Sequence, residues 1–354
     1  MVKFKKKISA FGLDLSDRSI KVAQLKRDGD KMDLYSYGRE DIEEGVIKNG
    51  EILDRKKVIE VIRKSLEGAK PKPIKSKFVV YSIPESKGFI RVIKIPFTEE
   101  KDIEQAIRYE AEQLFPIDIS ESYVDWQVIN EKDKKFLEVI VAVVPKIFVD
   151  AYSSIIKEIG LKPVAAEIES IAITRSLINK KQSERPILVI DLGKDRTSFI
   201  IFKNPAVQFT ASIPVCGDEF IAAISKNLKI NLEEAEKIKR KCGLKLTKEC
   251  KEVFKSVQPS LNEMIQYINK LTYYYKDHFN ANEDIAKVII CGGEAKMIGI
   301  SSFLSLQIKK EIEKGNPWIN IIKMGDKVIP PISRDDSLVF VTVLGLAIRA
   351  VEEF

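Results

Sequence analysis

The chain has 354 residues, of which 45% are hydrophobic and 31% are charged, and its formal net charge is +7. This apolar content excludes a disordered tail, and the length allows more than one domain of about 100 to 200 residues. The single histidine, His278, argues against Ser-His-Asp or Cys-His catalysis and against histidine-based metal sites.

The predicted elements form two similar series. The first series begins with three strands separated by turn residues, continues with an amphipathic helix, and adds another strand. It resumes after residue 162 with a strand and a helix, and the polar residues 180–185 connect it to the second series. In chain order these elements cover residues 8–15, 19–25, 32–37, 55–68, 78–83, 164–168 and 170–179.

A unit with its own β-α-β-β-α pattern, the inserted block, interrupts the first series at residues 88–162. Its elements cover residues 89–95, 99–114, 123–129, 137–144 and 146–159. The second series has strands at 187–192, 197–202, 207–214 and 288–291, and helices within 218–228, 232–242, 253–279, 297–312 and 336–351. We therefore predict an α/β chain with a first half, 1–185 (core 1–87 and 163–185, closed by helix 336–354), and a second half, 186–335.

Each half opens with the same motif, a β-hairpin whose turn begins with an aspartate and ends with a hydroxyl residue. The two hairpins read FGLDLSDRSIKVAQL and LVIDLGKDRTSFIIF, with Asp14 and Asp191 in equivalent places. Such repetition indicates two related domains that face each other. A tight turn of this kind presents backbone N–H groups to phosphate, and its carboxylate can hold hydrated Mg²⁺. Either turn by itself is more often an ordinary hairpin turn.

Two further motifs lie in the second half. The segment VIICGGEAKMIGISSFL is a buried strand that runs through Gly292 and Gly293 toward a helix, a geometry that lets a nucleotide approach the backbone. The segment LEEAEKIKRKCG places Glu236 and Lys239 on one face of a helix. Taken singly, the first is an ordinary strand-to-helix turn and the second a surface ion pair.

In this order the motifs resemble the actin-like ATPase superfamily, in which two related halves enclose a nucleotide cleft. Three stretches make the chain similar to the PilM family of type IV pilus assembly proteins, which is related to the division protein FtsA. These are AIRYEAEQLFPIDISESYVDWQVI, EIGLKPVAAEIESIAITRSL, and IPVCGDEF with INLEEAEKIKRKCG. The resemblance covers nearly the whole chain. It implies an α/β actin-like ATPase fold with an FtsA/PilM-type inserted subdomain.

The resemblance also implies ATP and Mg²⁺ in the cleft, with Asp14 and Asp191 holding the metal through water. Glu169 is the expected catalytic residue that positions a water, and Glu167 is the second candidate. The expected nucleotide contacts are Ser16, Asp17, Arg18, Ser19, Lys21, Gly193, Lys194, Thr197, Glu236, Lys239, Gly292, Gly293 and Ala295.

Two departures from the family pattern bear on catalysis. The first turn reads Ser16-Asp17-Arg18 where the family commonly has Gly and Ser, and Glu294 replaces the usual small residue after the two glycines. We therefore expect an ATP-binding protein with slow ATPase activity at most.

The resemblance implies a partner as well. The expected function is a cytoplasmic scaffold that binds the N-terminal tail of a PilN-like bitopic inner-membrane protein and is recruited by it to the membrane. A groove between the inserted block and the first-half core, around Phe115, Pro116 and Ile117, is the expected binding place. The alternatives are an FtsA-like filament-forming ATPase, a homologous secretion-system component and a metabolic kinase of the same superfamily.

The remaining composition is less specific. Cys216, Cys242, Cys250 and Cys291 show no C-x-x-C spacing, so we expect buried free thiols rather than disulfides or a zinc site. Lysine clusters at 5–7, 70–77 and 239–241 lack interleaved aromatic residues, which argues against nucleic-acid binding. We expect solvated faces there, with attraction to an anionic membrane surface as the alternative. The absence of a long apolar run and of a signal-peptide cleavage site predicts a cytoplasmic chain.

Overall fold

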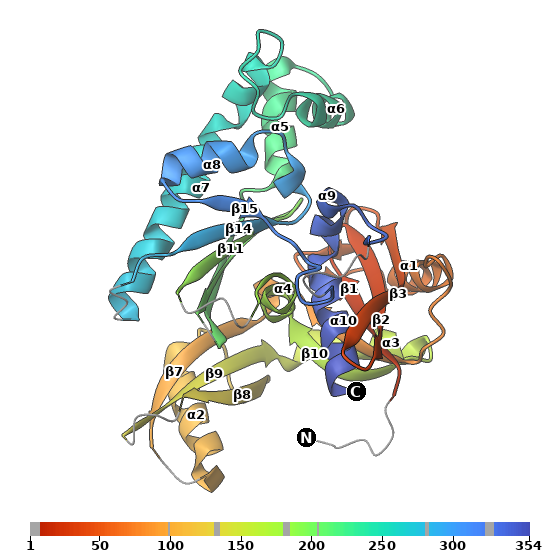
Figure 1. Ribbon diagram of the computed structural model, residues 1–354, viewed down its shortest axis with the longest axis vertical. Helices are drawn as coiled ribbons and strands as arrows, with labels where there is room; N and C mark the ends of the chain where they lie inside the picture. The colour runs from red at the N-terminus through yellow and green to blue at the C-terminus, as the bar shows by residue number, and fades with distance from the viewer. Residues whose placement is uncertain are drawn as a thin grey trace.

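The computed structural model describes residues 8–97, 100–130, 135–179, 185–203, 205–279, 283–322 and 329–354. These residues form two mixed β-sheets with helices around them, and a smaller unit extends from the second sheet (Figure 1). The expected connection 180–185, except for Arg185, and the lysine cluster 5–7 lie outside the described residues.

The first sheet has five strands in the order β10-β6-β1-β2-β3. Strands β1, β2 and β3 are antiparallel neighbours, and β6 and β10 extend the sheet in parallel from the other side of β1. The strands are β1 (Ala10–Leu15), β2 (Ser19–Asp28), β3 (Lys31–Asp41), β6 (Phe78–Ile83) and β10 (Lys162–Ile168). A small hairpin of β4 (Ile47–Lys48) and β5 (Glu51–Ile52), which the sequence did not predict, follows β3.

The second sheet repeats this plan in the order β15-β14-β11-β12-β13. Strands β11, β12 and β13 are again antiparallel neighbours, and β14 and β15 extend the sheet in parallel from the other side of the central strand β11. The strands are β11 (Ile187–Leu192), β12 (Thr197–Lys203), β13 (Ala206–Ile213), β14 (Lys287–Cys291) and β15 (Ile312–Lys314). Asp14 and Asp191 are each the last residue but one of the central strand, so the predicted duplication is confirmed.

Two helices lie between the sheets at the centre of the molecule, α4 (Glu169–Leu177) and α10 (Val341–Glu353) (Figure 1). They cross closely at Gly345, where an added Cβ would lie 1.9 Å from the carbonyl oxygen of Ala172. Only glycine permits this approach, because a contact that short does not occur between real atoms. The sheets, together with the helices packed on each, form the two halves of the molecule.

The inserted block adds three antiparallel strands, β7 (Phe89–Pro96), β9 (Phe136–Pro145) and β8 (Ser122–Asn130). Helix α2 (Glu100–Leu114) covers one face of these strands with apolar side chains. A single bridge between β7 and β13 makes them continuous with the second sheet, which thereby reaches eight strands. Helix α3 (Lys146–Glu158), which the sequence analysis included in the block, packs on β10 and α1 (Arg55–Glu67) of the first half.

The second half carries α5 (Gly217–Leu228), α6 (Leu232–Cys242), α7 (Lys251–His278) and α8 (Ile300–Ile308). The helix predicted at 297–312 is wrong at both ends. Gly299 and Lys309 have positive φ values of 85° and 53°, so the helix spans only the residues between them. The short strand β15 follows. The terminal helix predicted at 336–351 is divided into α9 (Arg334–Ser337), a 3₁₀ turn and α10.

The expectation of four free thiols is also wrong. Cys216 and Cys291 are buried free thiols, but Cys242 and Cys250 form a disulfide. Cys242 ends α6 and Cys250 precedes α7, and the loop between them turns at Gly243, so the two Cα atoms lie 5.2 Å apart. The motif search missed this pair because it depends on how two helix ends meet.

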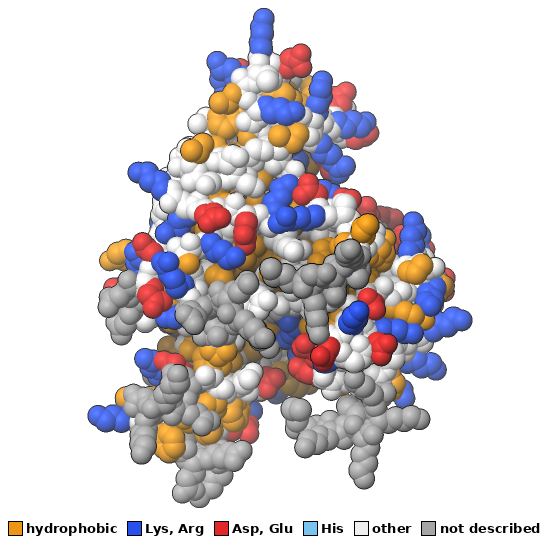
Figure 2. All heavy atoms as spheres, viewed as in Figure 1, with side chains coloured by type: hydrophobic (Ala, Val, Ile, Leu, Met, Phe, Trp, Pro, Cys, Tyr) orange, Lys and Arg blue, Asp and Glu red, His pale blue; other side chains and the backbone are white. Residues whose placement is uncertain are grey.

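The distribution of charged side chains on the surface agrees with the mixed charge of the sequence. Positive and negative side chains are interspersed over the face seen in Figure 2, without one continuous basic field. Within the described residues, no helix is both long and apolar enough to cross a bilayer.

Candidate functional site

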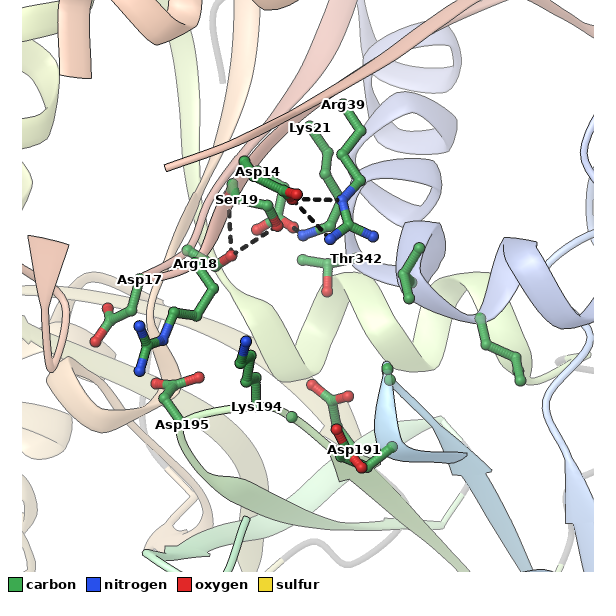
Figure 3. A pocket seen from close by; sticks show the side chains of 18 of the residues that line it. Asp14, Asp17, Arg18, Ser19, Lys21, Arg39, Asp191, Lys194, Asp195 and Thr342 are labelled. Carbon is green, nitrogen blue, oxygen red and sulfur yellow. Dashed lines mark hydrogen bonds and ion pairs between the residues drawn. The ribbon is translucent and has the colours of Figure 1, made fainter. Parts of the chain in front are cut away.

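A cleft of about 1120 Å³ lies between the two halves. Its walls are the turn after β1, the turn after β11, the start of α4, and the segment that follows β14. Figure 3 shows Asp14 and Lys21 on one side of the open space and Asp191 on the other. The sheet duplication explains this arrangement, because each central strand delivers its aspartate to the same end of its sheet.

Asp14 is held by two side chains of the first sheet. Its Oδ2 accepts a hydrogen bond from Lys21 Nζ at 2.9 Å, and its Oδ1 accepts one from Ser82 Oγ at 3.0 Å. Lys21 stands opposite Asp14 in the antiparallel register of β1 and β2, so the strand pairing itself creates this ion pair. The carboxylate is therefore fixed in direction before any ligand binds.

Asp191 and Glu169 carry strongly perturbed carboxyl groups. Burial, together with the negative charge of Asp14, raises the pKa of Asp191 to about 6, and Lys21 opposes the shift. Burial and Asp14 also raise the pKa of Glu169 well above its usual value, against the positive charge of Arg196. Glu169 accepts a hydrogen bond from the backbone N–H of Glu85 at 3.0 Å. Carboxyl groups with raised pKa values indicate a site in which nearby positive charge does not balance the negative charge.

A divalent cation fits this deficit. No three acidic, histidine or cysteine side chains in the described part of the chain gather closely enough to ligate a metal directly. A hydrated Mg²⁺ needs only one or two protein carboxylates when phosphate oxygens and water complete its shell. The donor set of Asp14 and Asp191 fits such a metal.

The two turns offer backbone donors to phosphate. In the described structure the N–H groups of Asp17 and Arg18 in the first turn, and of Lys194 and Asp195 in the second, donate to no protein acceptor. Ser16 and Ser19 add hydroxyls to the first turn, although Ser16 Oγ donates to the Ser19 carbonyl at 2.8 Å. Free amides from opposite sides suit an anion placed between the turns.

Arg18 and Asp17, the unusual residues of the first turn, have structural partners. Arg18 forms ion pairs with Glu44 at 3.0 Å and with Asp218 at the start of α5 in the opposite half. The Asp17 carboxylate accepts hydrogen bonds from the backbone N–H groups of Asn49 and Gly50, the latter at 2.8 Å. The carboxylate of Asp17 thus caps the β4–β5 turn.

Three expected residues do not line the cleft. Thr197 is fully buried and donates its hydroxyl to the Val215 carbonyl at 2.6 Å, and Ala295 is also fully buried. Glu167, the second candidate for positioning water, is paired with Arg175 at 2.5 Å outside the cleft. In place of Thr197, strand β12 presents the hydroxyl of Ser198 to the cleft, since neighbouring residues of a strand point to opposite faces.

The part of the cleft where adenosine is expected is more filled by protein side chains than the motifs suggested. Glu294 lies against Gly217, and both its carboxylate oxygens accept from Lys239 Nζ, at 2.8 and 2.7 Å. Gly292 has φ 85°, and a Cβ there would lie 2.3 Å from Asp191 Oδ1, so glycine is required. Glu236 and Gly293 also line the cleft, as expected.

Arg196 lies in the second turn, whose residues 193–197 the resemblance placed at the phosphates, and it lines the cleft. It pairs with Asp195 at 2.9 Å and with Asp17 of the opposite half at 3.7 Å. Thr342, which the sequence reasoning missed, reaches the cleft from α10 (Figure 3). No motif marks Thr342.

A second cavity of about 440 Å³ lies beside the inserted block. Phe115 and Pro116 line it, as expected for the partner groove, but Ile117 does not. Phe115 is only 7% exposed and packs edge-on against Phe89, with the ring centroids 6.3 Å apart. The groove was predicted against the first-half core alone. The structure corrects this, because β13 and α7 of the second half supply one of its walls.

The comparison with known families is decisive for the fold. A sequence model of the family described as type IV pilus assembly protein PilM matches residues 12–351. The chain belongs to this family. The match to PilM extends over both halves and the inserted block, so the resemblance noted in the sequence is confirmed.

Solved structures agree. A chain of the PilM–PilN type IV pilus biogenesis complex matches with a TM-score of 0.83 and 21% identity, over 98% of this chain and 100% of that one. MreB5 of Spiroplasma citri bound to AMPPNP matches with a TM-score of 0.58 and 13% identity, over 97% and 96% of the two chains. EutJ of Carboxydothermus hydrogenoformans matches with a TM-score of 0.57 and 16% identity, over 95% and 88%. The actin-like ATPase fold is confirmed.

More distant sequence relatives are division proteins. FtsA of Bacillus subtilis is 22% identical over 257 residues, which cover 65% of this chain and 57% of that protein. FtsA of Pseudomonas aeruginosa is 28% identical over 93 residues, covering 26% of this chain and 22% of that protein. The chain therefore spans little more than half, or less, of the length of these relatives.

The raised pKa of Asp191 predicts a pH-dependent stability. The folded chain binds this proton more tightly than the unfolded chain, so the stabilisation is complete below about pH 4 and is lost as the pH rises through about 6. The shift corresponds to at most about 3 kcal/mol. Asp191→Asn, which cannot ionise, should gain stability relative to the original protein between pH 4 and pH 7.5 in urea unfolding. An unchanged difference across this range, as expected for the exposed control Asp33→Asn, would contradict the assignment.

Proposed function

We propose that this chain is a nucleotide-dependent scaffold of type IV pilus assembly that binds ATP with Mg²⁺ in the cleft and a PilN-like partner in the groove. One observation carries the nucleotide proposal. Two equivalent turns face each other across the cleft, and each combines an aspartate of the central strand with backbone amides that no protein group uses.

Different residues of the chain would contact the metal, the phosphates and the adenosine. Asp14 and Asp191 would hold the hydrated metal, and the turns at 16–18 and 193–196 would hold the phosphates, with Lys21 and Lys194 as point charges. Glu236 and the Gly292–Gly293 segment would face the adenosine. Bound Mg²⁺ supplies the positive charge that the buried carboxyls lack. The AMPPNP in the similar MreB5 structure supports a nucleotide in this fold.

The first prediction from this proposal concerns binding. Mg-ATP should stabilise the protein by roughly 2.7 kcal/mol at a hundredfold excess over Kd. Asp191→Asn should bind more weakly because it removes a metal-side charge, whereas Asp33→Asn on the exposed surface should bind normally. Thermal unfolding and calorimetry with and without Mg²⁺ measure both effects. A melting temperature that does not respond to Mg-ATP would show that the cleft is vestigial.

We propose that any hydrolysis is slow. Glu169 is the acid best placed near the phosphates, but its Oε2 already accepts the backbone N–H of Glu85 at 3.0 Å, and the first turn carries Asp17 and Arg18 where the family commonly has Gly and Ser. Turnover should therefore lie well below a typical value of about 10 per second. Glu169→Gln should remove the remaining activity while nucleotide binding persists. A rate near the typical value that depends on Glu169 would contradict the scaffold proposal.

The partner proposal rests on the family and on the groove. The PilM-containing structure with a TM-score of 0.83 comes from a complex with PilN, which supports a PilN-like partner for this chain. A partner of this kind would hold a cytoplasmic chain at the inner face of the membrane. The groove offers an apolar wall of Leu114, Phe115 and Pro116 to a short peptide.

Two residues of helix α2 test the groove. Leu114 is 37% exposed and lines the cavity, whereas Tyr109 on the same helix is 65% exposed and lies outside it. Leu114→Asp should weaken binding of a synthetic PilN-like tail about tenfold or more, roughly 1.4 kcal/mol, because it places a charge on the apolar wall. Tyr109→Asp should have no effect. Equal losses in both variants, measured by fluorescence anisotropy, would exclude the groove as the binding place.

A further inference from the structure

One end of the first sheet carries an exposed basic segment, the loop of residues 68–77 between α1 and β6. Strands β1 and β10 begin beside the first residue of β6, so the loop ends at the opposite end of the sheet from Asp14 and the cleft. In Figure 1 the loop leaves α1 and descends along the outer side of β3. Four lysines of the loop and one of β2 form what we call the lysine row: Lys26, Lys70, Lys72, Lys75 and Lys77. The row lines neither the cleft nor the groove.

The backbone of this loop is held against the first sheet at several points. Tyr37 and Lys70 exchange two backbone hydrogen bonds, both 2.8 Å long. The buried hydroxyl of Ser36 donates to the Lys72 carbonyl at 2.8 Å. Ile74 is only 6% exposed, and its N–H donates to the last turn of α1 at 3.0 Å. Because the backbone and Ile74 face the protein, the lysine side chains face outward, and all five are exposed.

Tyr35 joins β2 to the loop. Leu34 and Ser36 pair with successive residues of β2, so Tyr35 is the extra residue of a β-bulge in β3. The ammonium groups of Lys26 and Lys72 lie over its ring, 3.7 and 4.0 Å from the centroid. Hydrogen bonding to Lys72 and the charge of Lys26 lower the pKa of the Tyr35 phenol, as expected where positive charge is in excess. The bulge therefore gathers lysines from two separate segments around one ring.

The positive charge of the row is not balanced by the protein. On the adjacent helix α1, Lys57 and Lys64 each pair with a glutamate. Asp33 stands opposite Lys26 in the register of β2 and β3. Even so, within the part of the chain that the structure describes, no carboxylate forms an ion pair with any lysine of the row. Five like charges on a fixed backbone repel one another, and an anionic surface would relieve this repulsion.

The surroundings of the row favour lipid headgroups as that surface. None of the exposed large hydrophobic side chains of the described chain lies in residues 24–37 or 68–78. A protein interface usually has an apolar core, whereas adsorption to anionic headgroups requires only charge. Single-stranded nucleic acid is usually bound by stacking of bases on aromatic rings, but two ammonium groups occupy the ring of Tyr35. The row contains lysines only, which act as point charges without the planar fork of arginine.

We propose that the lysine row binds directly to the surface of a membrane that contains anionic lipids. This inference goes beyond the proposed function, in which a partner brings the chain to the membrane, and it does not depend on that partner. The cleft lies at the other end of the first sheet, so the row can lie against lipid while the cleft stays open to nucleotide. Each lysine near such a surface contributes about a fivefold change in partitioning.

The test is sedimentation of the intact protein, without a partner, with vesicles of phosphatidylcholine that contain about one third phosphatidylglycerol. The protein should bind these vesicles and not vesicles of phosphatidylcholine alone. Binding should fall steeply between about 0.05 and 0.3 M salt, because salt screens exposed charges. The triple variant K70Q/K72Q/K75Q should bind at least about twentyfold more weakly. Hydrogen exchange of the original protein should slow at residues 68–77 when the anionic vesicles are added.

A matched control removes the same number of charges elsewhere. Lys241, Lys245 and Lys248 are exposed at the end of α6 and in the loop that follows it, in the second half. The triple variant K241Q/K245Q/K248Q should change vesicle binding by less than about threefold, because it alters the net charge and not the row. Both triple variants should unfold at the temperature of the original protein, since every substituted side chain is exposed.

The outcomes separate this inference from the proposed function. Equal losses in the two triple variants would mean attraction by net charge alone and overturn the role of the row. Absence of binding to the anionic vesicles at low salt, or equal binding to neutral vesicles, overturns it as well. Retention on double-stranded DNA that only K70Q/K72Q/K75Q loses, without vesicle binding, assigns the row to nucleic acid and also overturns it. None of these results affects the nucleotide or the PilN-like partner.

Discussion

The cleft is organised by the mutual repulsion of three closely placed carboxyls, the buried Asp14 and the partly buried Asp191 and Glu169. They come from two central strands and one helix, and the packing that buries them leaves Lys21 and Arg196 as the nearby cations that oppose their charge. Such a cluster is tolerated in a fold when a ligand supplies the missing positive charge. The duplication of the sheet explains its geometry, and the proposed nucleotide with a divalent metal would explain its chemistry.

The two halves are also connected across the cleft by reciprocal ion pairs. Arg18 of the first turn reaches Asp218 in the second half, and Arg196 of the second turn reaches Asp17 in the first. Both arginines belong to the turns that would hold phosphate. A phosphate placed there would compete with these carboxylates for the same guanidinium groups. The proposed nucleotide binding would thereby be linked to the relative position of the halves through the same few side chains.

Local patterns predicted the parts of this site that local sequence determines. The hairpins around Asp14 and Asp191 and the two glycines after β14 follow from turn chemistry and strand alternation, whereas Glu169 at the start of α4 was expected only from the family resemblance. Contacts between distant segments did not follow. That Thr197 points inward while Ser198 points to the cleft depends on the face of β12, and the Cys242–Cys250 disulfide depends on how two helix ends meet.

The packing of the inserted block against the rest of the chain could not be predicted from local sequence either. Its strands and α2 were recognisable from periodicity, but no local pattern indicated that α3 packs on the first half or that β7 touches β13. The contacts of α3 with α1 and of β7 with β13 join residues more than fifty positions apart. The groove therefore has a wall from the second half that no motif marks.

The central claim is that the cleft holds a metal-bound nucleotide between the two duplicated turns. A crystal structure with Mn²⁺ and AMPPNP tests it most directly, because anomalous scattering locates the metal independently of the protein. The metal should lie between Asp14 and Asp191, with water between it and the carboxylates, and the phosphates should lie against the turns at 16–18 and 193–196. A nucleotide bound elsewhere, or a metal that approaches neither aspartate, would contradict it.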